Sequence, residues 1–389
     1  MNSIFILSLI LILVGFILLK NIKINKNIFF CIFITILIII FSLNIENSLE
    51  ACIEGIKLCF KSIIPTIFTF SVICNLLILY DGIEIYSKIL GPIICKPLGL
   101  SKACAFPIAA SMLCGYPLGA KYSSDLYSLG HINFKEYNRL LKIASNAGPI
   151  FIIGAIGASL LNNISYGYFL LISNYFSLFL IGIFTRPKNF RYINEKKDNI
   201  FYRKVNFGRA MDTAINNSIK TTVTVSGYVV AFSVFISFFK NSDFIISIFN
   251  KIESFLNLKE NILYSFFIGS IEMTNGCNIV SNSTFDIHLK LGLVSFFLAF
   301  SGLSIIAQTS SFTSKYNIKT FKFLCSKLIQ GIISFIISFS LSKFVFISEK
   351  VFSGNLEKAT SIYNLIPVAL IILVIPFFIV KFKNLFHSS

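Results

Sequence analysis

Long runs of hydrophobic residues, separated by short polar segments, dominate the chain. A helix needs about 20 mostly apolar residues to cross the hydrocarbon core of a bilayer. The pattern predicts nine membrane-spanning helices, at Ile4–Leu19, Ile28–Leu43, Ile63–Tyr80, Ile143–Leu161, Tyr166–Phe184, Val223–Phe239, Leu291–Gln308, Leu328–Phe346 and Tyr363–Val380. Between Glu46 and Lys61 the apolar residues recur as in an amphipathic helix, which we expect to lie on the outer interface.

The apolar stretch between Lys102 and Lys121 contains residues that do not fit a straight helix. Proline removes a backbone donor and clashes with the preceding turn, and glycine gives the chain conformational freedom. The run CGYPLGAK therefore predicts the bend of a helical hairpin, with Gly115, Pro117 and Gly119 as bend residues. Because a lysine stands on either side, we expect this hairpin to enter and leave the membrane at its cytoplasmic face.

A second interrupted stretch, Ile262–Ser283, contains Glu272 and Gly276 and predicts a matching re-entrant hairpin that enters from outside. Gly148 and Pro149 predict another bend. Non-helical backbone at membrane depth is tolerated only where it is buried in protein or lines a water-filled cavity. Both hairpin tips are therefore expected to lie on a ligand path.

The order of these elements repeats along the chain. A span, a broken hairpin and two further spans cover residues 50–184, and the same order covers residues 212–346. The first copy begins outside and the second inside, which predicts an inverted repeat, as in secondary transporters whose discontinuous helices surround a midplane site. The other segments are two N-terminal spans (1–49), a basic cytoplasmic loop (185–222) and a C-terminal span with a short cytoplasmic tail (347–389). The predicted fold class is an all-α polytopic membrane protein.

Composition excludes a soluble globular protein. Of the 389 residues, 55% are hydrophobic and 13% charged, whereas soluble domains have about 25% charged residues. There are 34 basic and 17 acidic residues, a balance that in a soluble chain would suggest nucleic acid as a partner. Here the basic residues gather in alternate loops, so we expect no nucleic-acid partner.

Lysine and arginine favour cytoplasmic loops, so their distribution gives the orientation. We expect a multi-pass protein of the cell membrane with its N-terminus outside and its C-terminus in the cytoplasm. The proposed inner side includes four lysines before the eighth span: Lys315, Lys319, Lys322 and Lys327.

Glu272 is the first candidate for binding a solute, because an acidic group in an apolar segment costs about 2.5–3.5 kcal/mol unless it is paired or hydrated. It could coordinate a cation, carry a coupling proton or accept hydrogen bonds from a sugar or base; alternatively, the tip is exposed to water. Asn275, Asn278 and Asn146 are candidates for the same solute, or else they cap broken helices. Lys121 could meet an anionic solute or Glu272, or reach the headgroups.

Tyr116 is expected to shape the first bend or to stack on a ring of the solute. The nine cysteines contain no CxxC pair and the three histidines are scattered, so we expect no metal site. Neither HExxH, GxSxG nor GxxxxGK[ST] occurs, and we expect neither catalytic residues nor a cofactor.

The run CGYPLGAKYSSDLYSLGHINFKEYNRLLKIASNAGPIFIIGAIG, from Cys114 to Gly157, resembles the signature half of the YlbJ-type sporulation integral membrane proteins. GSIEMTNGCNIVSNS and SGLSIIAQTSS resemble their second half, so the resemblance covers about residues 50–346. These proteins are part of a broader group with Gate, or nucleoside-recognition, domains. The resemblance implies a role in endospore formation, especially of the spore cortex, in the mother-cell or forespore membrane of a Gram-positive bacterium.

We therefore expect a transporter of a small polar solute of unknown identity, surrounded by membrane lipids. It is expected to act as a homo-oligomer or together with other sporulation membrane proteins. Two alternatives remain. One is a non-transporting assembly or scaffold protein, and the other is a membrane enzyme of cortex-precursor handling that uses Glu272 with Asp286.

Overall fold

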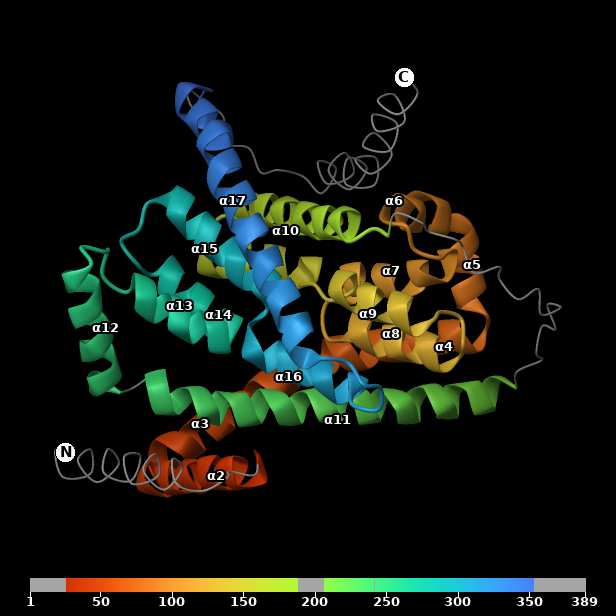
Figure 1. The fold of residues 1–389 in the computed structure, drawn as a ribbon, viewed down its shortest axis with the longest axis horizontal. Coiled ribbons are helices and arrows are strands. Elements are labelled where there is room, and N and C mark those ends of the chain that lie inside the picture. The colour runs from red at the N-terminus through yellow and green to blue at the C-terminus, as the bar shows by residue number, and fades with distance from the viewer. Residues whose placement is uncertain (1–25, 188–205, 241, 353–389) are drawn as a thin grey trace.

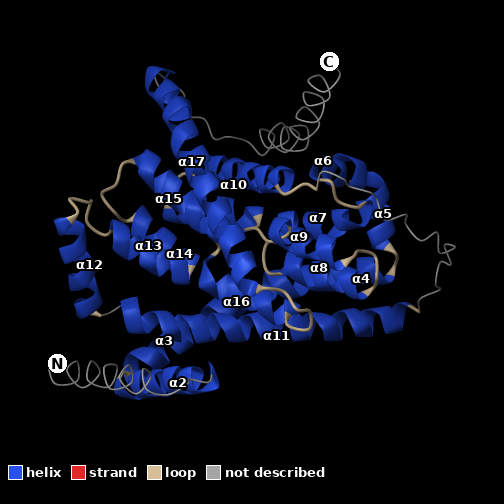
Figure 2. Ribbon diagram, in the orientation of Figure 1, coloured by secondary structure: helices blue, strands red, loops and turns tan. Residues whose placement is uncertain are grey.

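The computed structural model describes residues 26–187, 206–240 and 242–352. Every regular element in these residues is a helix, as Figure 2 shows. Five of the described helices are long and apolar enough to cross a membrane, or six if one bent pair counts as a single span. The all-helical membrane class is therefore confirmed. The predicted spans Ile4–Leu19 and Tyr363–Val380 lie outside the described residues, and the count of nine stays a prediction.

The first half begins with α2 (Lys26–Leu43) and a continuous rod made of α3 (Ile45–Leu58), η1 (Cys59–Phe68) and α4 (Thr69–Leu79). The prediction separated an interfacial helix, Glu46 to Lys61, from the following span. The structure instead joins them into one helix of 35 residues. Pro65 does not end this helix because it lies in the π-helical segment η1, whose register differs from that of an α-helix.

The rest of the first half consists of shorter helices: α5 (Gly82–Ile89), η2 (Gly91–Cys95), α6 (Lys96–Leu98), η3 (Lys102–Cys104), α7 (Ala105–Cys114), α8 (Leu118–Ser128), α9 (Phe134–Ile143), η4 (Ile150–Leu160) and α10 (Ile164–Phe184). α7 packs against α8 across a bend that contains Pro117. The predicted span Ile143–Leu161 is not continuous, because residues 144–148 are not helical. Pro149 disfavours helical geometry in the residue before it.

The second half contains α11 (Phe207–Lys240), α12 (Asp243–Phe255), α13 (Ile262–Ile271), α14 (Met273–Ser281), α15 (Ile287–Phe300), α16 (Gly302–Thr313) and α17 (Thr320–Phe352). α11 begins inside the segment predicted as a loop, so residues 207–222 are helical. The predicted span Leu291–Gln308 is broken at Ser301, where φ is 70° and is followed by 75° at Gly302. Two consecutive positive φ angles are incompatible with a right-handed helix.

The described helices follow the same order in both halves. Each half has a long helix, a short helix, a packed helix pair, a helix interrupted by a break, and a final helix. The two long helices pack together, since α11 contacts α3, η1 and α4, and the two final helices, α10 and α17, also pack together. In Figure 1, α11 runs along one side of the molecule and α17 crosses α10.

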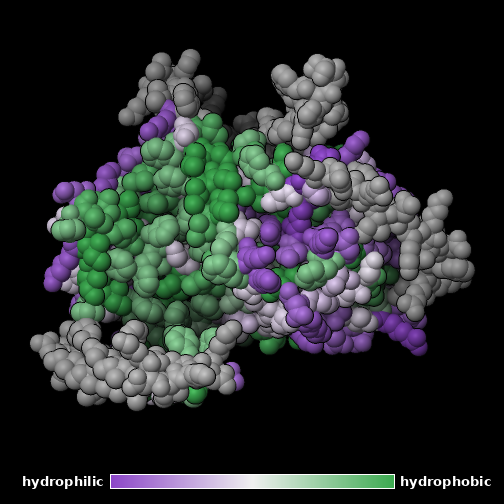
Figure 3. Space-filling model, viewed as in Figure 1, coloured by the Kyte–Doolittle hydropathy of each residue, from purple (hydrophilic) through white to green (hydrophobic). Residues whose placement is uncertain are grey.

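Hydrophobic residues cover much of the surface over α13 and α17, whereas hydrophilic residues gather over α9 (Figure 3). At the end of α9, the pKa of Lys142 is lowered by burial and further by the neighbouring charges of Lys322 and Arg139. Lys322, in the first turn of α17, therefore lies close to the basic residues at the end of α9. Lys322 and these residues were all predicted to be cytoplasmic, so their proximity agrees with a single orientation.

Glu253, which is 1% exposed, fixes the junction between α12 and α13. Its carboxylate accepts hydrogen bonds from the backbone N–H groups of Asn261 and Leu263, both at 2.7 Å, and of Tyr264 at 3.2 Å. The first N–H groups of a helix have no intrahelical acceptor, so this carboxylate satisfies the start of α13.

We expect Glu253→Ala to lower the free energy of unfolding by about 2 kcal/mol, because buried donors lose a charged acceptor. Thermal unfolding of the detergent-solubilised protein measures this loss. Glu260→Ala is the matched control, since Glu260 is exposed in the same junction. An equal fall in both variants would contradict the capping role.

Candidate functional site

The bend between α7 and α8 lies against the break between α9 and η4. The backbone nitrogen of Tyr116 donates a hydrogen bond to the carbonyl oxygen of Asn146 at 2.7 Å. Gly115 has φ 83°, and a Cβ atom there would lie 2.7 Å from the nitrogen of Gly148. Glycine is required at this position both by its backbone conformation and by the close approach. The first bend and the first break thus form one unit.

Glu272 separates α13 from α14 and caps α14. Its Oε1 accepts the Thr274 N–H at 3.0 Å, and its Oε2 accepts the backbone N–H of Asn275 at 2.8 Å and the side-chain amide of Asn275 at 2.9 Å. A Cβ atom at Gly302, in the break between α15 and α16, would lie 3.1 Å from the carbonyl oxygen of Ile271. The second bend therefore also lies against the break of its own half.

The two bends meet through side chains. The hydroxyl of Tyr116, in the first bend, contacts the sulfur of Met273, the first residue of α14. Since Met273 directly follows Glu272, the structure brings together four predicted site residues: Tyr116 and Asn146 from the first half, and Glu272 and Asn275 from the second.

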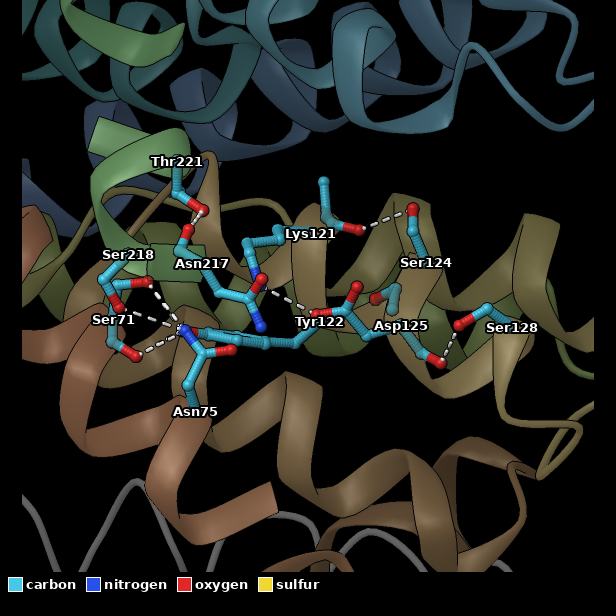
Figure 4. A network of polar contacts seen from close by, with 12 residues as sticks. Ser71, Asn75, Lys121, Tyr122, Ser124, Asp125, Ser128, Asn217, Ser218 and Thr221 are labelled. Atoms are coloured by element: carbon cyan, nitrogen blue, oxygen red, sulfur yellow. Dashed lines mark hydrogen bonds and ion pairs between the residues drawn. The ribbon is translucent and has the colours of Figure 1, made fainter. Parts of the chain in front are cut away.

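Two other predicted site residues make local contacts instead. The side-chain oxygen of Asn278 accepts a hydrogen bond from Asn282, one turn further along, at 3.1 Å. The ammonium of Lys121 pairs with Asp125 at 2.8 Å and lies 4.5 Å from the ring centre of Tyr122 (Figure 4). Lys121 therefore interacts with its own helix rather than with Glu272.

Lys327 does not lie in a loop before the eighth span, as predicted together with the other cytoplasmic lysines, and it is 0% exposed. α17 already begins at Thr320, so Lys327 lies two turns inside the helix. Its Nζ donates hydrogen bonds to the carbonyl oxygen of Ser145 at 2.5 Å and to Oε1 of Gln330 at 2.7 Å. The amide of Gln330 in turn donates to Oδ1 of Asn146 at 3.2 Å. Side chains of α17 thus form hydrogen bonds with the non-helical residues between α9 and η4.

A signal for this arrangement is visible in the sequence. Polar residues recur at intervals of three or four along α17, and all of them are buried: Lys327, Gln330, Ser334, Ser338 and Ser342. Residues at this spacing share one face of a helix. This polar stripe would have indicated that Lys327 faces the interior.

A polar cluster that the sequence did not indicate joins α4, α8 and α11 (Figure 4). The side-chain amide of Asn75 donates to the carbonyl oxygen of Ser71 at 2.8 Å and to the hydroxyl of Ser218 at 3.2 Å, while the hydroxyl of Tyr122 donates to Ser71 at 3.4 Å. The first helix pair is therefore tied to the two long helices that pack together.

Some buried side-chain atoms have no hydrogen-bond partner among the described residues, including Ser145 Oγ, both amide atoms of Asn174, Gln308 Oε1 and Thr309 Oγ1. Leaving such an atom unsatisfied costs about 1–3 kcal/mol. Gln308 and Thr309 lie on α16, which packs against α8. The described residues contain no group of three His, Cys, Asp or Glu side chains able to hold a metal ion. The amides of Asn275 and Gln308, the hydroxyl of Thr309 and the carboxylate of Glu272 are groups that can bind a polar solute by hydrogen bonds.

Known proteins share features with this chain. Residues 60–139 match the family model of Gate, described as nucleoside recognition. The chain is 26% identical over 309 residues to the sporulation integral membrane protein YlbJ of Bacillus subtilis, an alignment that covers 74% of this chain and 76% of that protein. An outward-facing structure of a CNTnw double variant superposes with a TM-score of 0.46 at 13% identity, covering 78% of this chain and 82% of the other.

The matched segment runs from η1 through the first bend to α9. The alignment with YlbJ is long enough to include more than this one segment. The resemblance that the motif from Cys114 to Gly157 indicates is thus confirmed: this integral membrane protein contains a segment that matches the Gate family and is similar to the sporulation protein YlbJ over most of its length.

Proposed function

We propose that this protein is a transporter that moves a small polar solute, of the nucleoside class, across a membrane of the sporulating cell and is needed for the spore cortex. The observation that carries this proposal is the contact between Tyr116 and Met273, which joins two helix bends that each lie against a broken helix. Bends and breaks at membrane depth are costly unless they surround a polar path. The nucleoside class and the sporulating cell come from the descriptions of the matched family and relative.

The parallel order of helices supports an inverted repeat of two units, residues 50–184 and 212–346. Such repeats surround a site near the middle of the bilayer, and one group of helices moves against the other to alternate access. The contacts between helices divide the described helices into two groups that could move in this way. The rod α3–η1–α4 with α11 is one group, and the helix pairs with the broken and final helices are the other.

The solute would bind to polar atoms of the second bend and of α16. Glu272 and Asn275 offer a carboxylate and an amide at the second bend. Gln308 and Thr309 offer buried oxygens without a partner in the described residues. A sugar hydroxyl or a base edge can donate to these oxygens, and Tyr116 offers an aromatic face for the base.

Uptake of radiolabelled uridine and adenosine into liposomes that contain the purified protein tests this function. We expect saturable uptake that empty liposomes lack, together with restored sporulation when the gene is expressed in Bacillus subtilis without its YlbJ protein. Restored sporulation without uptake of any nucleoside would overturn the transport proposal and favour a scaffold. Turnover of a lipid-linked cortex precursor would favour an enzyme.

Oxidation of two native cysteines should lock the proposed movement. The thiol of Cys74, in α4, lies beside the thiol of Cys114, the last residue before the first bend. A disulfide would fix the bend to the rod, so we expect copper phenanthroline to reduce uridine uptake at least about tenfold, a change of about 1.4 kcal/mol in apparent barrier.

The measurement compares uptake before oxidation, after oxidation and after reduction with dithiothreitol. Cys74→Ser serves as the control, because it leaves Cys114 without a partner for a disulfide. We expect this variant to keep its uptake under oxidation. Full uptake by the cross-linked wild type would show that the first bend does not move relative to α4.

A further inference from the structure

The contacts of Lys327 resemble those of a bound cation more than those of an ion pair. Its Nζ lies 2.5 Å from the carbonyl oxygen of Ser145 and 2.7 Å from Oε1 of Gln330. The three ion pairs within the described residues do not include Lys327. Removing a charge from water costs several kcal/mol, so a buried ammonium needs compensation from its surroundings.

The surroundings supply oxygen atoms rather than negative charge. α17 packs against α9, α10, α15 and α16. The sole acidic residue on these four helices is Glu136, whose Oε1 is occupied by the backbone N–H of Ser101 and the thiol of Cys104. Ser145 lies just after the end of α9, where the helix dipole places partial negative charge. The ammonium of Lys327 therefore lies among carbonyl and amide oxygens at the end of a broken helix.

Many transporters use unwound carbonyls and the ends of half-helices to coordinate a sodium ion. We propose that the ammonium of Lys327 is a tethered cation that occupies an alkali-cation site formed by the oxygen atoms of Ser145 and Gln330, with Asn146 positioning Gln330. The hydroxyl of Ser145, which is buried and has no partner among the described residues, is a further oxygen on the same residue. The site is closed by the protein's own side chain, so the structure needs neither sodium nor potassium there.

Removing the tethered charge tests this inference. Lys327→Ala leaves the oxygen atoms and opens space for a free ion, whereas Lys327→Met fills the same space with an apolar chain of similar length. Each protein is purified and its thermal unfolding is measured in NaCl, KCl and choline chloride at equal ionic strength. The chain has nine cysteines and no tryptophan, so a thiol-reactive dye is the suitable probe.

We expect sodium or potassium to raise the melting temperature of Lys327→Ala by about 4 °C over choline in a saturable way. The wild type and Lys327→Met should show no such difference. Saturable stabilisation of the wild type by either ion overturns the inference, and so does a Lys327→Ala variant that responds to neither. If Lys327→Ala is not recovered, Lys327→Ser, which adds a hydroxyl oxygen, repeats the test, and failure of both to fold in NaCl or KCl also overturns it.

A second measurement rests on the proposed function. Uridine uptake by the wild type should not change with a sodium or potassium gradient, whereas uptake by Lys327→Ala should require one of them. The melting temperatures test the cation site, and the uptake assay tests the proposed transport. A wild type that does not carry uridine contradicts the proposed function alone, because the melting temperatures still decide whether Lys327 occupies a cation site.

Discussion

Replacing Glu272 by glutamine should reduce nucleoside uptake at least about tenfold while lowering stability only slightly. Glutamine keeps the shape of the side chain but removes its charge, and its NH₂ group would face N–H donors that the carboxylate now accepts, those of Thr274 and Asn275. Loss of a cap costs about 1 kcal/mol. A tenfold loss of flux corresponds to a further 1.4 kcal/mol, about one strong hydrogen bond to the solute.

The comparison must separate capping from transport, and Asp286 provides the control. Asp286 caps α15 as Glu272 caps α14, accepting the N–H of Leu289 at 3.1 Å. Its side chain is 51% exposed and pairs with Lys259. We expect Asp286→Asn to lower the melting temperature by a similar amount and to leave uridine uptake unchanged. If both variants transport normally, Glu272 is a cap and nothing more.

The bends between α7 and α8 and between α13 and α14 could be predicted from sequence because their signals are local. Pro117 and Gly115 cannot continue a helix in an apolar run, and the bend occurs where they stand. Glu272 was predicted as an unusual charge in a bend, and it lies between two packed helices. That it caps α14 was not foreseen, since capping was assigned to the neighbouring asparagines.

Features set by tertiary contacts were not predictable in the same way. Hydropathy is uninterrupted across Leu291–Gln308, so the break at Ser301 gave no signal except Gly302. Lys327 was counted with the cytoplasmic lysines because the positive-inside rule treats every lysine near the end of a span alike. Its buried partner Ser145 is 182 residues away in sequence, so no local pattern indicates that contact.

The largest loss of stability is expected from a methyl group at the glycines where backbones touch. A Cβ atom at Gly119 would lie 2.2 Å from the carbonyl oxygen of Ala144, at the end of α9. A Cβ atom at Gly276 would lie 2.3 Å from the Cα atom of Gly269, on the facing helix of the second pair. Both obstacles are backbone atoms, which cannot rotate away as a side chain does. We expect Gly119→Ala and Gly276→Ala each to cost about 3 kcal/mol or more.

The matched control is Gly154→Ala, because a Cβ atom at Gly154 in η4 meets nothing within 4 Å. Alanine loses less entropy than glycine on forming a helix, so this variant should be as stable as the wild type or more stable by up to about 1 kcal/mol. Yield of monodisperse protein in detergent and the midpoint of thermal unfolding measure all three. The same unfolding midpoint for Gly119→Ala, Gly276→Ala and Gly154→Ala would show that the helices at both bends pack less closely than the distances indicate. The solute path between the bends would then have to be wider.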